Sequence, residues 1–511
     1  MTRTGRTVAF LIPFLAALAG GGCGSSFTPT PLETTGQPAE PLGPVFDLEI
    51  SLPQLFVPEA GSRGLELELR LDLEAAGPGQ HAARYTVEGA TAGMNRMVEV
   101  TDLGDGSTSI LVTGETWRSD RIGPLKVGTM AFEMLLDGAP EDGGRHVSGE
   151  ALESQTNLGG PFTGWSRHRF LVAASEFANA GRITEVALIK EREIRVREIL
   201  VEVSGDPAVR RTRRAVFVLN RFTFDNIQRL DPDRDFSTTW QAGMGAGSNP
   251  HDILLLEDGR AYVTRYEPPF NDLAVIDAAS GEILSTIPLA GLAENRDGTP
   301  RADRLAAAGG AVFAGLQDID RTFTRFAEGK LAVIDPLRDQ VVGVVPLGGK
   351  NPGAMDVLMG EDGRLRIYVA LAGIFPGLQP QELSGGVAVV DVANRAFERL
   401  ALDDDDAGGN LGALAMVSER LGYVVRTDAA LENSVLAFDP EAGTVRRTVV
   451  QSSDFIPEIE ADHGGVLAVP DRAFLTPRLC LYRIPADPGA AETLVGCGDL
   501  EVSPFSLEAL D

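Results

Sequence analysis

The 511-residue chain is poor in the residues that most often build catalytic and metal centres, with only three cysteines and five histidines. So few histidines argue against a His-rich metal centre, and the lack of a C-x-x-C-H motif excludes covalent haem attachment of that kind. The chain also has no G-x-S-x-G turn, no P-loop and no dinucleotide-binding fingerprint. The sequence therefore shows no evident catalytic constellation.

Basic residues are also in deficit, since 73 acidic residues face 45 basic ones and the formal net charge is −28. A charge of this sign disfavours nucleic acid and anionic lipid as electrostatic partners. After residue 22, no run of 18 or more apolar residues occurs, so no transmembrane helix is predicted there.

The N-terminus reads as a targeting segment over residues 1–22. Arg3 and Arg6 precede an apolar stretch at residues 8–19 that is too short to span a membrane, and small residues then lead to Cys23. This pattern resembles a bacterial lipoprotein signal, which implies lipidation of Cys23. Gly24, in place of Asp, implies the outer membrane within that class. Ordinary secretion with cleavage nearby is the alternative.

Two regions are predicted between this segment and the repeats described next. Residues 23–43 are rich in Ser, Thr, Pro and Gly, which is typical of a disordered tether. Residues 44–207 contain alternating apolar and polar runs, clearest at residues 65–73, which predict an antiparallel β-sandwich, with an immunoglobulin-like form as one version. The polar, basic residues 206–214 are expected to form the interdomain linker.

Residues 249–291 hold the unit that recurs over residues 208–511. It contains four short strand patterns separated by tight turns, including Asp258-Gly259 and Ser280-Gly281. The third strand pattern recurs at spacings of about 44 to 58 residues, near the blade length of β-propellers. Its copies end on Asp231, Asp277, Asp335, Asp391, Asp439 and Arg483. The five Asp residues are interpreted as turn-formers whose carboxylates accept backbone N–H groups.

The runs DGRAYVTRY at residues 258–266 and NDLAVIDAASGEILSTIPL at residues 271–289 resemble the YVTN-type repeat of bacterial lactonase-like propellers. The resemblance implies a β-propeller of the cell envelope, and such propellers include both enzymes and binding modules. We expect six blades, with residues 503–510 completing the first. A seventh blade that uses residues 192–203 is the alternative.

Two further features concern candidate sites. Cys480 and Cys497 lie in neighbouring strand patterns of the last repeat, which predicts a structural disulfide in an exported protein. His251 and Asp252 begin the first strand of a blade, and first strands line a propeller's channel, so both are channel-binding candidates. A structural, hydrogen-bonded histidine is the alternative.

The segment at residues 294–303 is the best indication of a metal. Asn295, Asp297 and Asp303 offer oxygen ligands around Gly298, as Ca²⁺ requires, although the spacing is not that of an EF-hand. An exposed polar turn without a metal is the alternative. Asp403, Asp404, Asp405 and Asp406 are interpreted as a solvated acidic run.

Together these features predict a lipid-anchored, exported propeller that binds or scaffolds a protein, peptide or glycan ligand and has no catalytic role. The alternative is a lactonase-like or other hydrolytic enzyme that uses channel carboxylates and a divalent metal.

Overall fold

The computed structural model describes two parts of the chain in different detail. It gives the strand backbone from Val45 to Arg167, and both backbone and side chains from His168 to Leu510 apart from residues 176–180, 189–192, 212–214, 223, 233, 235, 377–378 and 463–464. The predicted signal, Cys23 and the predicted tether lie outside the described residues.

The first eight strands form one closed antiparallel sheet. Each strand pairs with the next, and β1 also pairs with β8, so the sheet closes on itself. This architecture is all-β, as predicted, but its eight described strands join into one closed sheet, whereas a sandwich packs two separate sheets face to face. The strands are β1 (Val45–Leu52), β2 (Leu65–Gly77), β3 (Gln80–Val87), β4 (Met94–Asp102), β5 (Thr108–Gly114), β6 (Met130–Leu136), β7 (His146–Glu153) and β8 (Leu158–Ala174).

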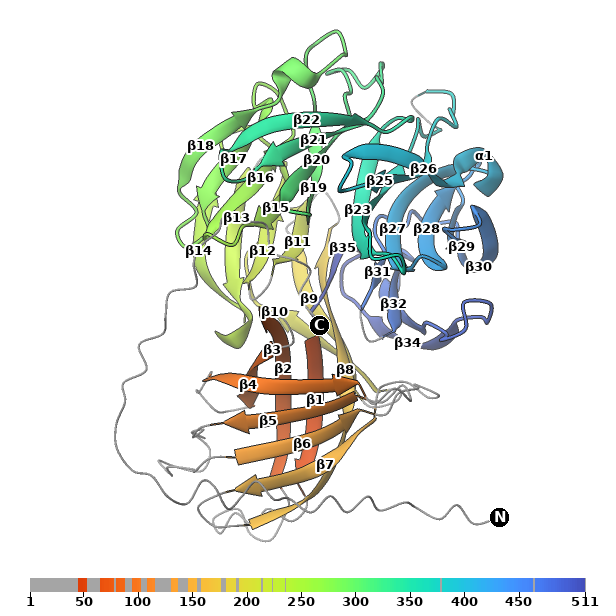
Figure 1. Ribbon diagram of the computed structural model, residues 1–511. Helices are drawn as coiled ribbons and strands as arrows, with labels where there is room; N and C mark the ends of the chain where they lie inside the picture. The colour runs from red at the N-terminus through yellow and green to blue at the C-terminus, as the bar shows by residue number, and fades with distance from the viewer. Residues whose placement is uncertain are drawn as a thin grey trace. The chain divides into compact units, whose positions relative to one another are not determined.

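The remaining strands form a seven-bladed β-propeller in which every blade has four antiparallel strands. Figure 1 shows β11, β15, β19, β23 and β35 toward the middle of the ring and β14, β18, β22, β26 and β30 at its periphery. The strands of six blades are β11 (Pro207–Thr212), β12 (Ala215–Asn220), β13 (Asn226–Asp231), β14 (Ser237–Gly243); β15 (Pro250–Leu255), β16 (Arg260–Arg265), β17 (Asp272–Asp277), β18 (Ile283–Pro288); β19 (Ala302–Ala308), β20 (Ala311–Leu316), β21 (Lys330–Asp335), β22 (Gln340–Pro346); β23 (Pro352–Met359), β24 (Leu365–Leu371), β25 (Gly386–Asp391), β26 (Ala396–Asp403); β27 (Asn410–Ser418), β28 (Leu421–Thr427), β29 (Asn433–Asp439), β30 (Thr444–Ser452); and β31 (Glu460–Ala461), β32 (Val466–Asp471), β33 (Arg478–Arg483), β34 (Thr493–Asp499).

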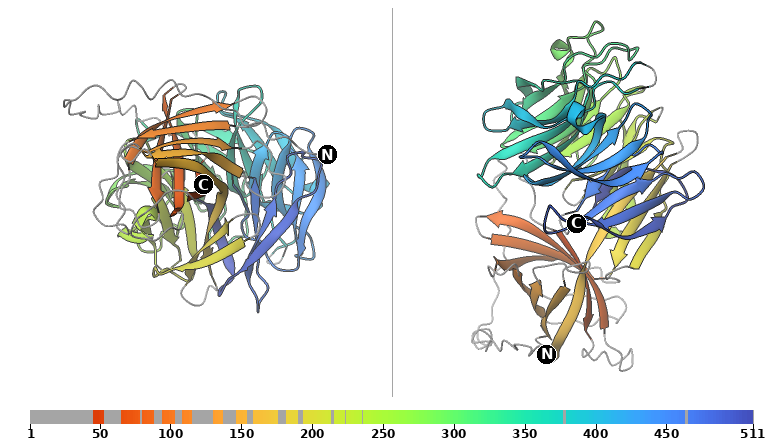
Figure 2. Two further views of the ribbon diagram at one scale, coloured as in Figure 1. Left: turned by 90° about the horizontal axis from the view of Figure 1, so that it is seen from below. Right: turned by 90° about the vertical axis from the view of Figure 1, so that its right-hand side faces the viewer.

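The seventh blade joins segments from both sides of the repeats. Its inner strand is β35 (Pro504–Ala509), followed outward by the C-terminal part of β8, then β9 (Arg182–Ile189) and β10 (Glu193–Ile199). Figure 2 shows the blue C-terminal strands beside the yellow strands of this blade. Phe170, Val172 and Leu507 of this blade pack with Val466 and Leu481 of the preceding one, which seals the ring.

The seven-blade alternative is thus the observed one, and the six-blade expectation is wrong. Residues 503–510 do supply an inner strand, but to the blade of β8–β10. The blade that ends its third strand at Asp231 has its own inner strand, β11, in the segment that we expected to be a linker. The propeller therefore begins before residue 207.

The repeated Asp residues act as predicted in the turns that the structure describes. Oδ1 of Asp277 accepts the backbone N–H of Ala279 at 2.8 Å, and Oδ1 of Asp335 accepts that of Leu337 at 2.9 Å. Asp391 and Asp439 make the same kind of bond to the amides of Asn394 and Glu441. These carboxylates satisfy turn amides that would otherwise lack a partner.

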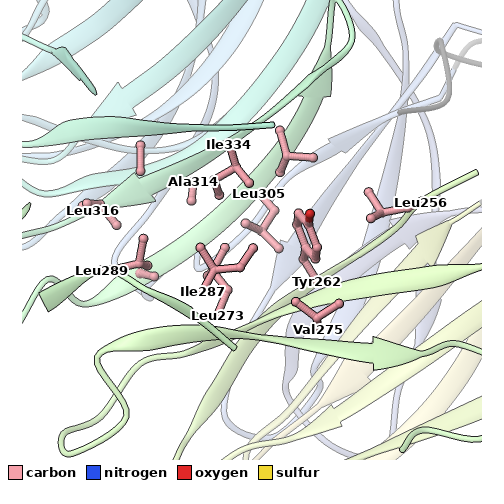
Figure 3. Close-up of a cluster of buried hydrophobic side chains, with 13 residues drawn as sticks. Leu256, Tyr262, Leu273, Val275, Ile287, Leu289, Leu305, Ala314, Leu316 and Ile334 are labelled. Carbon is pink, nitrogen blue, oxygen red and sulfur yellow. The ribbon is translucent and has the colours of Figure 1, made fainter. Parts of the chain in front are cut away.

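The hydrophobic core lies between neighbouring blades. In Figure 3, Tyr262, Leu273 and Val275 from one blade meet Leu305 and Ala314 from the next. All five are buried, and burial of such side chains contributes roughly 1.5–3 kcal/mol for each large one.

Helix is confined to short segments within the described residues: α1 (Asp404–Ala407), η2 (Pro232–Arg234) and η3 (Ala290–Leu292). None of the helices in that part of the chain has the length and apolarity needed to cross a bilayer.

Candidate functional site

Charged side chains from the inner strands of several blades form a network in the propeller centre. Arg210 on β11 bonds the Asp252 carboxylate at 2.9 Å through Nε and lies 3.3 Å from Glu458 through Nη2. Arg304 on β19 binds the same Glu458 oxygen at 2.8 Å. Inner strands of a propeller converge on one axis, which is why residues far apart in sequence meet here.

The carboxylates of this network also join neighbouring blades through backbone amides. Asp252 Oδ2 accepts the N–H of Leu305 on the next blade at 2.7 Å, and Glu458 Oε2 accepts that of Leu507 at 2.8 Å. Asp356 on β23 repeats the arrangement with Met416 at 2.6 Å. The bonds hold inner strands that have no direct strand-to-strand pairing with each other.

Burial disfavours the charged form of these acids. It raises the pKa of Asp252 to about 6, against the lowering effect of Arg210, and raises that of Asp356 to about 6. Burial, together with Glu458, raises the pKa of Glu508 on β35 to about 8, while Arg210 opposes the shift. Arg210 therefore faces three carboxyl groups, those of Glu458, Asp252 and Glu508.

His251 lies at the start of β15 in a second, adjoining cluster. Its Nδ1 is 2.7 Å from Oδ1 of Asp303 on β19, and its ring stacks on Tyr266 with centroids 3.9 Å apart. Gln317 completes the cluster, because it donates to Asp303 Oδ2 at 3.1 Å and accepts from the Tyr266 hydroxyl at 2.6 Å. Burial lowers the pKa of His251, although Asp303 partly opposes this effect.

Arg301 also contacts Tyr266 in this cluster. Its guanidinium lies 4.8 Å from the Tyr266 ring centroid and 4.1 Å from that of Phe323, and it bonds Glu267 at 2.7 Å. Cation–π contacts of this kind hold aromatic rings in place. The cluster can therefore present a neutral imidazole, oriented by a carboxylate, as a hydrogen-bonding group or a proton acceptor.

The structure places the predicted channel residues in different roles. Asp252 is buried in the network with Arg210, whereas His251 belongs to the cluster with Asp303. The hydrogen-bonded histidine that we considered as the alternative is consistent with this geometry.

The predicted calcium segment divides between two environments. Asn295 Oδ1 accepts the amides of Asp297 and Thr299 at 3.0 and 3.3 Å, and Asp297 Oδ2 accepts that of Arg321 at 3.0 Å. Asp303, by contrast, is committed to His251 and Gln317. Calcium at this segment stays a prediction. In the described part of the chain, the one group of three close acidic ligand atoms is Asp403, Asp404 and Asp405.

Cys480 on β33 and Cys497 on β34 are directly opposite partners in the last repeat. The structure joins them in a disulfide with a Cα–Cα distance of 4.0 Å. The bond covalently links the third and fourth strands of that blade.

Sequence reasoning missed Arg210, Glu458 and Glu508. Arg210 lies in the segment that we expected to be a linker, and Glu458 precedes the two-residue strand β31. One of the three could have been found from the sequence. Because residues 503–510 were expected to form an inner strand, Glu508 in that strand could have been proposed for the propeller centre.

One face of the propeller carries most of the exposed phenylalanines. We call it the loop face; it is where the second strand of each blade ends and where the fourth strand passes to the next blade. Four phenylalanines of these connections are at least half exposed, Phe474 reaching 94 %. Among the residues whose side chains are described, the exposed large apolar ones of the loop face are Leu200, Phe222, Phe224, Phe323, Leu431, Phe455, Phe474 and Leu475.

No protein-family model and no curated protein matches the chain. Among solved structures, it is similar to a candidate 6-phosphogluconolactonase from Bacteroides fragilis at 15 % identity, over 68 % of this chain and 98 % of that one, with a TM-score of 0.48. It is also similar to hydrazine synthase of Kuenenia stuttgartiensis at 17 % identity, over 61 % of this chain and 95 % of that one, with a TM-score of 0.42.

Proposed function

We propose that this protein is a lipid-anchored, exported β-propeller that binds a partner through its loop face and has no catalytic role. The observation that carries the proposal is the collection of exposed phenylalanines on that one face. Exposed apolar groups that gather on a surface mark interaction sites more often than scattered ones do. Aromatic side chains are also enriched where proteins bind their partners.

The charged groups of the propeller centre support a binding role over a hydrolytic one. Asp252 accepts hydrogen bonds from Arg210, Ile253 and Leu305, and Glu458 binds two arginines and the amide of Leu507. These carboxylates hold the ring together, and a general base needs a carboxylate that reaches substrate.

A hydrolytic enzyme of the lactonase-like kind is the second candidate, because His251 and Asp303 form a hydrogen-bonded His–Asp pair. A histidine oriented in this way can act as a general base. In that case the substrate would approach the His251 cluster and not the phenylalanines of the loop face.

Site-specific photo-crosslinking in the cell envelope tests the binding proposal. A photoreactive residue at Phe474 or Phe224 should give one discrete adduct. The same residue at Leu337, which is 62 % exposed in the turn between β21 and β22 on the opposite face, should give none. Identical adducts from all three positions, or no adduct from the loop face, would contradict the proposal.

Two further assays separate the alternatives. Purified protein should not hydrolyse lactones above the background rate. If it does, and if His251→Asn abolishes the turnover, the protein is a hydrolytic enzyme and the binding proposal is wrong.

Cell fractionation tests the lipid anchor. Cys23→Ser should move the protein from the membrane fraction to the soluble fraction, and an unchanged distribution would refute lipidation at Cys23.

A further inference from the structure

Two arginines from different blades flank one aromatic ring at the centre of the loop face. The guanidinium carbon of Arg221 lies 5.2 Å from the ring centroid of Phe505, and that of Arg472 lies 5.9 Å from it. Phe505 belongs to β35 of the seventh blade. Arg221 follows β12 and Arg472 follows β32, in the two blades on either side of the seventh.

Arg472 is the unusual member of this pair. Its Nε is buried and has no hydrogen-bond partner, and it forms no ion pair within the described part of the chain. Burial lowers the pKa of its guanidinium, and only the more distant charge of Asp454 opposes that effect. Arg472 is a half-buried cation without a close counter-charge, which costs free energy that a bound anion would partly recover.

Arg221 offers a second donor at the same place. It bonds Asp206 at 2.7 Å through Nη2, yet its own Nε is buried without a partner. The corresponding Arg265 of the next blade differs, because Asp272 takes both its Nε and Nη2 at 2.8 and 2.6 Å. Arg426, at the end of β28, also has a buried Nε without a partner, whereas Arg221 and Arg472 bring this feature together at one place, beside the ring of Phe505.

The residues that follow the two arginines are apolar and exposed. Phe222 and Phe224 come after Arg221, and Phe474 and Leu475 come after Arg472. Their exposed fractions are 69, 51, 94 and 86 %. Apolar surface thus lies beside both cations. A ligand that fits this region therefore has one anionic group and also apolar groups that can cover the exposed phenylalanines.

We propose that the loop face binds a peptide through its free C-terminal carboxylate, with Arg472 and Arg221 as the donors and apolar peptide side chains on Phe224 and Phe474. The guanidinium fork matches a carboxylate in geometry and in charge, and charge-assisted bonds of this kind are the strong ones. This inference rests on the proposed function, because it names the ligand chemistry of the same face.

Isothermal titration of the full chain tests the proposal with three probes: N-acetyl-Ala-Ala-Leu-Phe with a free carboxylate, the same peptide as its amide, and phenylacetate. The free acid should bind about tenfold more tightly than the amide, and added salt should reduce this preference. It should also bind more tightly than phenylacetate. Equal binding of acid and amide, or failure of the acid peptide to bind, would overturn the carboxylate site. Equal binding of phenylacetate would overturn the peptide assignment.

Variants identify the donor. Arg472→Gln should weaken the acid peptide about tenfold and leave the amide unchanged, whereas Arg472→Lys should retain part of the preference. Arg234→Gln, at an arginine whose side chain is 78 % exposed in the turn after β13, is the matched control and should change neither. Unchanged acid binding in Arg472→Gln would refute the assignment. Phe474→Ser should weaken both peptides equally. If acid and amide bind alike but Phe474→Ser weakens both, loop-face binding stands and carboxylate recognition fails.

Discussion

His251 and Asp303 belong to neighbouring blades, and Nδ1 of the imidazole lies 2.7 Å from Oδ1 of the carboxylate. The contact links the starts of two inner strands, β15 and β19. It also unites two residues that the sequence suggested for separate purposes, one for the channel and one for a metal. Its strength can be measured directly.

We expect Asp303→Asn to lower the pKa of His251 further, because the negative charge that favours the imidazolium is removed. Loss of the charged acceptor should also reduce the free energy of unfolding by about 1–3 kcal/mol. NMR titration of the imidazole and denaturant unfolding at pH 7 measure the two effects. Asp297→Asn, whose carboxylate bonds the Arg321 amide instead, is the control. An unchanged His251 titration would contradict the coupling.

The raised pKa of Glu508, about 8, predicts a pH-dependent stability. Between the ordinary glutamate pKa and 8, the folded state holds a proton that the unfolded state has lost, so stability falls as pH rises through this window. Glu508→Gln should therefore gain stability relative to the wild type at pH 8–9, by on the order of a few kcal/mol at most, and much less at pH 5. Asp252 and Asp356 contribute with the same sign.

Thermal and urea unfolding from pH 5 to pH 9 test this prediction. Glu501→Gln, at a side chain that is 77 % exposed in the same C-terminal segment, provides the control. Parallel pH profiles for the wild type and Glu508→Gln would show that Glu508 does not carry the proton.

Closure of the ring through β35 makes Leu507 a stability determinant. This side chain is 1 % exposed and packs with Phe170 and Val466. Leu507→Ala should cost about 2–5 kcal/mol in the free energy of unfolding, as buried leucines usually do. Leu475→Ala, at a residue that is 86 % exposed, should change it by less than about 0.5 kcal/mol. Similar losses for both variants would argue against closure at this blade.

The disulfide of the last repeat should stabilise its blade. Cys480 and Cys497 are 17 residues apart, and closing a loop of this length contributes about 3 kcal/mol on the chain-entropy model. The double variant Cys480→Ser/Cys497→Ser should lose about that amount in denaturant unfolding. Addition of a reductant should destabilise the wild type and leave the double variant unaffected; equal sensitivity of the two proteins would exclude the bond.

Calcium at Asn295 and Asp297 is testable by metal analysis of protein purified without chelators. We expect one Ca²⁺ per chain and a lower melting temperature in EDTA. Asn295→Ala should abolish both properties, whereas Asp404→Asn, in the acidic group near α1, should preserve them. Absence of metal together with no EDTA effect would leave these side chains as turn-formers, the role in which their hydrogen bonds place them.

The sequence predicts the propeller well because each blade repeats local patterns, such as the apolar third strand and its terminal Asp. The blade count failed where the pattern is not local. β8 and β35 are neighbours in space but lie on opposite sides of all six regular blades in the sequence. No periodicity within β8 or β35 indicates that the two strands pair. The strand β11 was missed because its two arginines made the segment look like a polar linker.

Sequence reasoning identified His251, Asp252 and Asp303 one at a time, but it missed Arg210, Glu458 and Glu508 and did not predict that these groups meet. Oxygen-rich residues near Gly298 favour a metal loop, yet Asp303 lies one residue inside β19, where the neighbouring blade presents His251. Only the closed ring brings these groups together. The same is true of Arg221 and Arg472, which meet at Phe505 because the blade between them is completed last.

The shared seventh blade also sets an order for biogenesis. Since β35 supplies its inner strand, the ring stays open until the chain has been synthesised, and in an exported protein translocated, as far as Ala509. During that interval the unpaired edge of β8 would be available to other strands, a known route to misassembly. If the chain is exported as proposed, protection of that edge during translocation would favour correct assembly. Pairing of β35 with β8 is then the step that completes the folded ring.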